Sequence, residues 1–151
     1  MKIIILVPIY NDWQSVSKLL EEINSNIAGL QSQFSIIIIN DASTDQQSIN
    51  ALNTENLHSI KIINMKENRG HARCIATGLK HIFEKEEFDY VIPMDGDGED
   101  RPEEIKNFVD YLNYSSDKPI VGERIKRSES LFFKFCYSSH KILTFAFTGQ
   151  S

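Results

Sequence analysis

Residues 3–12 read IIILVPIYND, and this stretch decides the fold. Its first five residues form an uninterrupted apolar run that is rich in β-branched side chains. Such a run is typical of a strand in a parallel sheet that is covered on both faces. Asn11 and Asp12 can cap a helix, and the apolar residues beyond them recur at helical spacing from position 16 to position 27. The stretch therefore predicts a strand, a short polar loop and a helix in succession.

The same succession recurs along the chain. Further strands are predicted at residues 36–39, 60–65, 90–94 and 119–122, with helices at 45–52, from about 71 and from about 102. This alternation predicts an α/β fold with a mostly parallel central sheet and helices on both faces.

Two details of the later helices follow from residue spacing. Asp100 and Glu103 stand at the spacing of a capping box before the last helix. The helix that starts near residue 71 is expected to bury one face, made of Ile75, Leu79, Ile82 and Phe83.

Length, composition and charge narrow the class of protein. A chain of 151 residues with 41% hydrophobic and 25% charged residues has the size and composition of one soluble globular domain. The net charge of −5 argues against a nucleic-acid partner, since phosphate backbones are bound by a basic excess. No apolar run reaches the roughly 20 residues of a membrane helix, and Cys74 and Cys136 lack metal-site spacing. We therefore expect a cytoplasmic protein with a single domain over residues 1–151.

Polar clusters follow four of the predicted strands, at the point where each strand ends. They cover residues 8–12, 40–45, 68–70 and 95–100. Ligands of open α/β sheets bind beyond the carboxyl ends of the strands, near the point where the strand order reverses. The four clusters therefore predict one binding site at that edge of the sheet.

The last of these clusters is acidic and predicts a metal site. In an extended segment alternate side chains point the same way, so Asp95, Asp97 and Glu99 can converge on one point. Carboxylates this close repel one another unless a cation joins them, and hard oxygen ligands suit Mg²⁺ or Mn²⁺ with phosphate oxygens completing the shell. The alternatives are a solvated acidic turn and a calcium loop, although the twelve-residue calcium pattern is missing.

The other clusters offer nucleotide contacts. Asp41 can accept hydrogen bonds from a nucleobase or form a turn, and its spacing leaves both interpretations open. Tyr10 can pack beside a base, or belong to the core. Bidentate contacts to phosphate, or surface ion pairs, are open to Arg69, Arg73 and Arg124.

The sequence gives less support to a histidine metal site, an NTPase or a dehydrogenase. His71 and His81 have no partner at metal spacing, so both are interpreted as surface or cap residues. A Walker loop and a GxGxxG fingerprint are both missing from the sequence, which argues against an NTPase and a dehydrogenase.

Taken in order, these clusters resemble glycosyltransferase family 2, and the polyprenyl-phosphate sugar transferases are its nearest branch. The matching stretches are residues 7–12 (VPIYND), 39–45 (INDASTD), 68–70 (NRG) with 72–73 (AR), 94–97 (MDGD) with 102–103 (PE), and 121–124 (VGER). Each motif is short, but the ordered set is specific and spans nearly everything from Lys2 to Arg124.

The resemblance implies a Rossmann-like GT-A fold, a three-layer sandwich, and a role for each matching residue. It implies that Pro8, Tyr10 and Asp12 line the nucleoside pocket and that Asp41 contacts the base. Asp95 and Asp97 would be the DxD pair that binds the metal ion, Mg²⁺ or Mn²⁺, and the donor diphosphate. Catalytic roles would fall to Asp97 and Arg124, the latter near a phosphate, with further nucleotide contacts from Arg69, Gly70 and Arg73.

The chain also departs from the family pattern. Ala42 stands where glycine is common, which makes a positive φ harder to adopt there. Asp12 replaces a usual Glu, and Glu99 replaces the Gln of the polyprenyl-phosphate branch.

The implied activity is inverting transfer of a sugar from a UDP- or GDP-linked donor to a polyprenyl phosphate or a glycan. We expect the chain to be truncated before the rest of the acceptor site, and it offers no assignable general base. Residues 130–147 interleave aromatic side chains with lysines, so they can lie on the cytoplasmic face of a membrane or pack on another part of the protein. The alternatives are a non-catalytic or truncated nucleotide-sugar-binding module and a nucleotidyltransferase.

Overall fold

The structure is a computed structural model that describes residues 1–45, 54–112 and 120. Met1–Ser116 form one compact unit, to which everything below belongs, and Asp117–Ser151 form a second. The elements in chain order are β1 (Lys2–Ile9), α1 (Trp13–Asn26), β2 (Gln33–Asn40), β3 (Ser59–Asn64), α2 (His71–Lys85), β4 (Tyr90–Pro93), the 3₁₀ turn η1 (Pro102–Glu104) and α3 (Ile105–Leu112).

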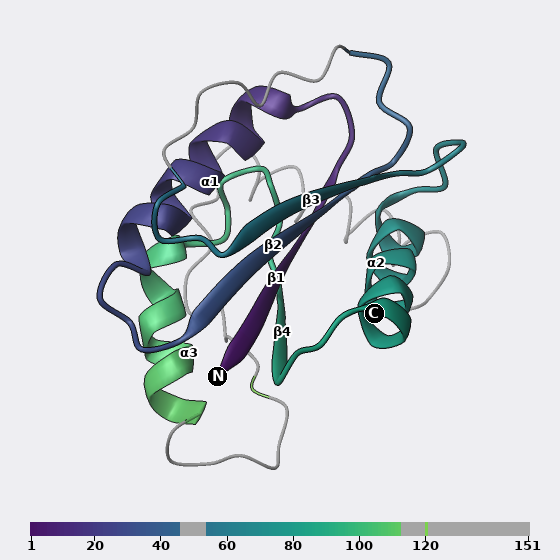
Figure 1. The fold of residues 1–151 in the computed structure, drawn as a ribbon. Coiled ribbons are helices and arrows are strands. Elements are labelled where there is room, and N and C mark those ends of the chain that lie inside the picture. Colours follow the sequence, from purple (N-terminus) through teal and green to yellow (C-terminus); the bar gives the residue numbers. More distant parts are fainter. Residues whose placement is uncertain (46–53, 113–119, 121–151) are drawn as a thin grey trace, which may run out of the picture. The chain divides into compact units, whose positions relative to one another are not determined.

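The four strands form one parallel sheet with the order β3-β2-β1-β4 (Figure 1). Ile5 at the centre of β1 pairs with Ile36 on one side and with Ile92 on the other. The chain therefore builds outward from β1 to β3 and then returns to the opposite side of β1 for β4. The strand order reverses between β1 and β4, which is where this class of sheet binds ligands. The predicted α/β fold is confirmed.

Helices cover both faces of the sheet, which gives three layers (Figure 1). Alternate residues of β1 explain this, since Ile3, Ile5 and Val7 pack in one core with α1 and α3. Ile4 and Leu6 point to the other face and pack in a second core under α2. Residues 3–7 present apolar side chains to both faces of the sheet. Both faces must therefore be covered by helices.

The N-termini of α1 and α3 are capped in different ways. Asp12 caps α1, because its Oδ1 accepts a hydrogen bond from the Ser15 N–H at 3.3 Å. The expected capping box before α3 is wrong. A 3₁₀ turn precedes α3, its N-cap is Arg101 without a side-chain cap, and the Asp100 carboxylate instead accepts the backbone N–H of Asp95 at 2.7 Å.

The buried face of α2 also differs from the prediction. Cys74, Gly78 and Ile82 are buried against the sheet. Leu79 is 41% exposed and Phe83 is 82% exposed, although both were expected in the core. Gly78 lies at the centre of the contact between α2 and the sheet, and the helix packs closest where it has no side chain. The buried face of α2 is therefore rotated relative to the predicted face.

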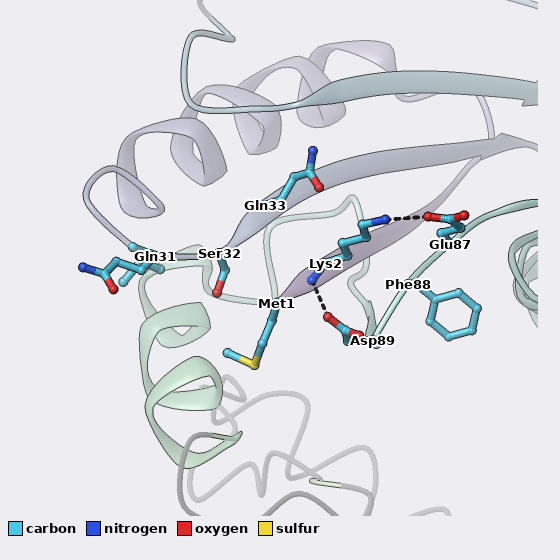
Figure 2. Close-up of a pocket in the computed structure, with 9 residues that line it drawn as sticks. Met1, Lys2, Gln31, Ser32, Gln33, Glu87, Phe88 and Asp89 are labelled. Carbon is cyan, nitrogen blue, oxygen red and sulfur yellow. Dashed lines mark hydrogen bonds and ion pairs between the residues drawn. The ribbon is translucent and has the colours of Figure 1, made fainter.

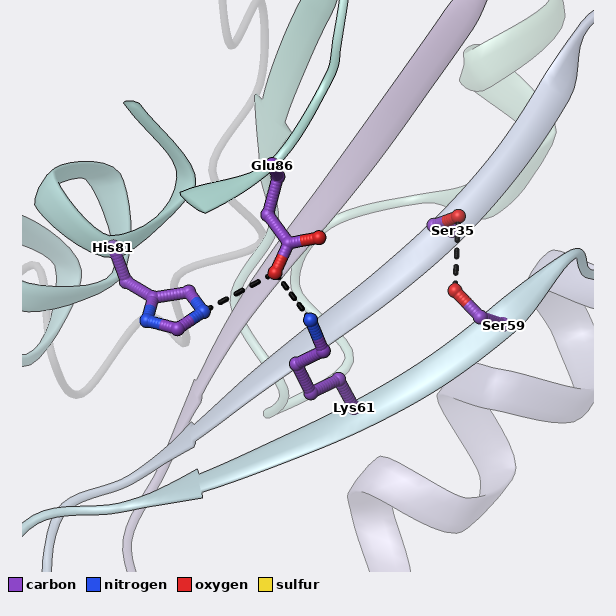
Figure 3. A network of polar contacts seen from close by, with 5 residues as sticks. All are labelled: Ser35, Ser59, Lys61, His81 and Glu86. Carbon is purple, nitrogen blue, oxygen red and sulfur yellow. Dashed lines mark hydrogen bonds and ion pairs between the residues drawn. The ribbon is translucent and has the colours of Figure 1, made fainter. Parts of the chain in front are cut away.

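A polar network fastens the end of α2 to the edge of the sheet (Figure 3). One oxygen of Glu86 accepts from Lys61 on β3 and contacts His81 Nε2 at 3.2 Å. The hydrogen bond from Lys61 lowers the pKa of Glu86, against the effect of burial, and His81 lowers it further.

Several expectations lie outside the described residues. These are the helix at 45–52 beyond its first residue, the strand at 119–122 apart from Ile120, the residue Arg124, and the segment 130–147. The single domain over 1–151 stays a prediction for the same reason. Among the helices that the structure describes, none has the length and apolarity needed to cross a membrane.

Candidate functional site

A cavity of about 200 Å³ opens at the carboxyl ends of β1 and β4, beside the first turn of α2. It lies where the strand order reverses, as the topology predicts. Its volume is below the roughly 300–1,000 Å³ of typical small-molecule pockets, so it suits one part of a nucleotide sugar. It is lined by Pro8, Ile9, Tyr10, Asp12, Val16, His71, Asp95, Gly96 and Asp97.

Five of the predicted site residues therefore meet in one place. Pro8, Tyr10 and Asp12 come from the end of β1 and the loop after it, and Asp95 and Asp97 come from the loop after β4. The Tyr10 side chain is half exposed, which leaves its ring open to a ligand. Residues more than 80 positions apart are brought together because β1 and β4 are neighbours in the sheet.

The acidic loop is a turn and not an extended segment. Its backbone bends at residues 96–98, with Gly98 at φ +82°. The Asp97 carboxylate accepts the Glu99 N–H at 2.9 Å. Because the segment bends, alternation does not bring Asp95, Asp97 and Glu99 to one point, and Glu99 does not line the cavity. In the part of the chain that the structure describes, no three His, Cys, Asp or Glu side chains gather closely enough to hold a metal.

The turn nevertheless brings several negatively charged carboxylates close to Asp95. Burial raises the pKa of Asp95 above its ordinary value, and the carboxylates of Asp100, Asp97 and Glu99 raise it further. His71 acts in the opposite direction, because its Nε2 lies 3.4 Å from Asp95 Oδ1. A carboxylate in this setting is stabilised by any cation that approaches it.

Gly96 allows the acidic loop to lie against the rest of the site. A Cβ atom at Gly96 would stand 2.9 Å from Val16 Cγ2 and 3.6 Å from the carbonyl oxygen of Pro8. A side chain here would collide with Val16 and would push the acidic loop away from α1.

Asp41, at the end of β2, contacts the protein's own backbone. Asp41 is 4% exposed. Oδ1 accepts the N–H of Arg69 and Oδ2 accepts the N–H of Gly70, each at 2.8 Å. Gly70 has φ +86° and precedes the first residue of α2.

The loops after β1 and β2 are also fastened together. Asn11 donates its N–H to Ser43 Oγ at 2.9 Å. Its Oδ1 accepts the backbone N–H groups of Thr44 at 2.7 Å and of Asp45 at 3.2 Å. Asn11 and Ala42 both have positive φ, at 55° and 57°, so the strained conformation expected to be difficult for Ala42 is adopted.

Of the predicted arginines, Arg69 and Arg73 lie in the described part of the chain, and neither lines the cavity. Arg69 forms an ion pair with Glu67, and Arg73 is exposed on α2. Conversely, sequence reasoning missed His71, which lines the cavity. The available signal was its position directly after the motif of residues 68–70.

A larger cavity, of about 730 Å³, lies at the opposite end of the sheet (Figure 2). Lys2 lines it and donates its backbone N–H to Asp89 at 2.7 Å and its ammonium group to Glu87 at 2.5 Å. The Lys2 ammonium group is thus paired with Glu87, and the Asp89 carboxylate is bound to a backbone N–H group, at the amino ends of the strands. We place the functional site at the smaller cavity, because the strand-end loops and three carboxylates, those of Asp12, Asp95 and Asp97, meet there.

Comparison with known proteins agrees with the fold. Residues 4–148 match the sequence profile of glycosyl transferase family 2. Undecaprenyl-phosphate 4-deoxy-4-formamido-L-arabinose transferases of Klebsiella pneumoniae (strain 342) and Proteus mirabilis (strain HI4320) are each 29% identical to the chain. Both alignments cover 88% of this chain and 40% of the relative, so the chain spans about two-fifths of the curated relatives it matches.

Solved structures share the fold. The crystal structure of S. aureus TarS 1–349 superposes with a TM-score of 0.60 at 21% identity, over 85% of this chain and 39% of that one. The same TarS segment in complex with UDP gives the same values. With the profile matching almost the whole chain, this protein belongs to glycosyl transferase family 2.

Proposed function

We propose that the protein is an inverting glycosyltransferase that takes a sugar from a UDP- or GDP-linked donor and transfers it to a polyprenyl phosphate. The observation that carries this is the cavity at the strand-order reversal, where Tyr10, Asp95 and Asp97 meet. The named activity of the curated relatives supports the acceptor class. TarS 1–349 was solved with UDP and with UDP-GlcNAc, which supports a nucleotide-sugar donor. A glycan acceptor is the alternative.

The residues of the acidic loop fit a divalent cation. Mg²⁺ and Mn²⁺ sites in nucleotide enzymes commonly use one or two carboxylates and complete their shell with substrate phosphates and water. Asp95 and Asp97 supply two carboxylates, and the crowding that raises the pKa of Asp95 would be relieved by positive charge. When bound, the ion supplies stabilisation of the negative charge that develops on the departing diphosphate.

The other residues of the site bind and orient the donor. Tyr10 offers a half-exposed ring on which a base can pack. Pro8 and Asp12 form the adjoining wall, and Asp12 also fixes the start of α1. Arg69, Arg73 and Arg124 stay proposed phosphate contacts, which requires the first two to leave their positions in this structure.

A phosphate acceptor explains why the activity needs no assigned general base. Transfer to a hydroxyl group requires removal of a proton by a positioned base. A phosphate monoester is already ionised at neutral pH, so its oxygen attacks without such help. We propose that residues 130–147 bring the protein to the cytoplasmic face of the membrane, where a lipid phosphate is presented.

The chain by itself has a second candidate function. Because it spans about two-fifths of its curated relatives, binding of the donor without transfer is the alternative for these 151 residues. The nucleotidyltransferase alternative is set aside by the family match.

Calorimetry tests the donor site directly. We expect the purified chain to bind UDP or GDP in the presence of Mn²⁺, and to bind it at least tenfold more weakly after chelation. Asp97→Asn should remove most of the metal dependence. Asp110→Asn, an exposed carboxylate on α3 paired with Lys106, is the matched control and should leave binding unchanged. Metal-independent binding would rule out the proposed cation, and no binding by a folded chain would rule out the donor site.

A further inference from the structure

We propose that His71 contacts the diphosphate of the donor and that Asp41 is the positioning residue that holds His71 in the site, an inference that rests on the function proposed above. The resemblance to the family assigns Asp41 to the base and gives His71 no role.

The burial of Asp41 and its hydrogen bonds indicate that its side chain binds the protein's own backbone. Asp41 as a whole residue is 4% exposed, so it presents little surface to a ligand. Its two oxygens each accept an N–H from one of two consecutive residues, Arg69 and Gly70, at 2.8 Å. Hydrogen bonds to an ionised carboxylate are stronger than neutral ones, and two of them on adjacent residues fix both the place and the direction of the loop.

That direction determines where His71 lies. Gly70 has φ +86° and ψ 159°, a conformation open to glycine, and α2 begins at the next residue. The residue that follows two fastened N–H groups has little freedom to move as a backbone unit. His71 is in this position, and its Nε2 lies 3.4 Å from Asp95 Oδ1 across the cavity.

The side chains that line the cavity favour a contact between His71 and a phosphate group of the donor. Three carboxylates line it, those of Asp12, Asp95 and Asp97. Among the cavity-lining residues in the described part of the chain, His71 carries the one nitrogen-bearing side chain. The imidazole can donate an N–H to a phosphate oxygen, and its side chain is 59% exposed. The side chains of Arg69 and Arg73 do not line the cavity.

Variants of His71 test the contact with the donor. With Mn²⁺ present, we expect His71→Ala to weaken nucleotide binding about tenfold, the loss of one hydrogen bond to a charged group. His71→Gln keeps an N–H donor and should stay within about threefold of the wild type. His58→Ala, an exposed histidine before β3, is the control and should have no effect. Unchanged or tighter binding by His71→Ala would overturn the contact, while a wild-type chain without nucleotide binding would reject the proposed function itself.

A double-mutant cycle tests the positioning role of Asp41. If Asp41 acts through His71, Asp41→Asn should weaken binding in the wild type but by less than about twofold in the His71→Ala background. If Asp41 reads the base, the two losses should multiply and the preference between UDP and GDP should change, which would overturn the proposal.

Hydrogen exchange of the wild-type chain tests the hydrogen bonds of Asp41 without a ligand or a variant. The amides of Arg69 and Gly70 should exchange at least tenfold more slowly than that of Asn68, for which the structure assigns no carboxylate acceptor. Equal rates would show that the carboxylate does not hold the loop.

Discussion

Gly78 on α2 lies against Leu6 on β1 so closely that no side chain fits between them. A methyl group at Gly78 would stand 2.5 Å from Leu6 Cδ1 and 2.8 Å from Ile39 Cγ1. Leu6 and Ile39 are both buried in the core beneath α2. The absence of a side chain at this position therefore sets the distance between the helix and the sheet.

Gly78→Ala should destabilise the protein even though alanine favours helices. Overpacking a core typically lowers the free energy of unfolding by about 1–3 kcal/mol, and the gain in helix propensity returns about 1 kcal/mol at most. We expect a net loss of about 1 kcal/mol or more in urea unfolding. Thr77→Ala, on the exposed side of α2, should stay within about 0.5 kcal/mol. A Gly78→Ala variant as stable as the wild type would contradict the close approach.

Ala42→Gly should have the opposite effect. Ala42 has φ +57°, which costs a residue with a Cβ about 1–2 kcal/mol. The greater freedom of glycine in the unfolded chain offsets about 0.4–1 kcal/mol of that. We therefore expect a gain of about 0.5 kcal/mol in the free energy of unfolding. The matched substitution Ala28→Gly, at a residue without positive φ, should lose stability instead. Equal effects at both positions would mean that Ala42 is not strained.

Glu86→Gln should reveal a pH-dependent contribution from the network with Lys61 and His81. The folded-state pKa of Glu86 is lowered, so its contribution is complete above the ordinary value of 4.5 and is lost as the pH falls through the folded value. We expect Glu86→Gln to lose about 0.5–1 kcal/mol at pH 7, with the difference from the wild type fading below pH 4.5. Glu84→Gln, which removes an exposed pair with Lys80, should show less than half of this loss. A loss that persists unchanged at pH 3 would exclude an electrostatic origin.

Cys74 should make the wild type sensitive to high pH. Burial, together with a smaller effect of the Asp41 carboxylate, raises the pKa of Cys74 from 9.0 to about 11, against a backbone hydrogen bond that lowers it. The unfolded thiol ionises first as the pH rises, so this contribution to stability falls between pH 9 and pH 11. Cys74→Ala is expected to be less stable than the wild type at pH 8. From pH 9 to pH 11, however, it should lose less stability than the wild type, as measured by urea unfolding under reducing conditions. Parallel losses would show that the thiol ionises equally in both states.

The four strands that the structure describes, and their order along the chain, could be predicted because they depend on local pattern. Residues 3–7 and 36–39 are apolar without interruption, and short runs of this kind are typical of a strand that is covered on both faces. The buried face of α2 could not be predicted in the same way. Hydrophobicity favoured Leu79 and Phe83, but the packing is decided by a glycine, which scores as neither apolar nor polar.

The grouping of side chains at one edge of the sheet was predictable, and their individual contacts were not. Strand ends of a parallel sheet meet at one edge, so the grouping of Tyr10 with Asp95 followed from the topology alone. The contact between His71 and Asp95 depends on the exact path of two loops that are distant in sequence. The same is true of Asp41, whose partners are backbone groups and leave no trace in residue type.

The strand order also governs how the chain must behave while it is being synthesised. β1 is made first, yet Tyr90, the β4 partner of Ile3, emerges from the ribosome roughly 4–17 s later at 5–20 residues per second. During that interval one edge of an isoleucine-rich strand has no partner, which is the arrangement most prone to pair with another chain. We therefore expect nascent chains that end before residue 90 to depend on chaperones, and longer ones to be released from them as β4 closes the open edge.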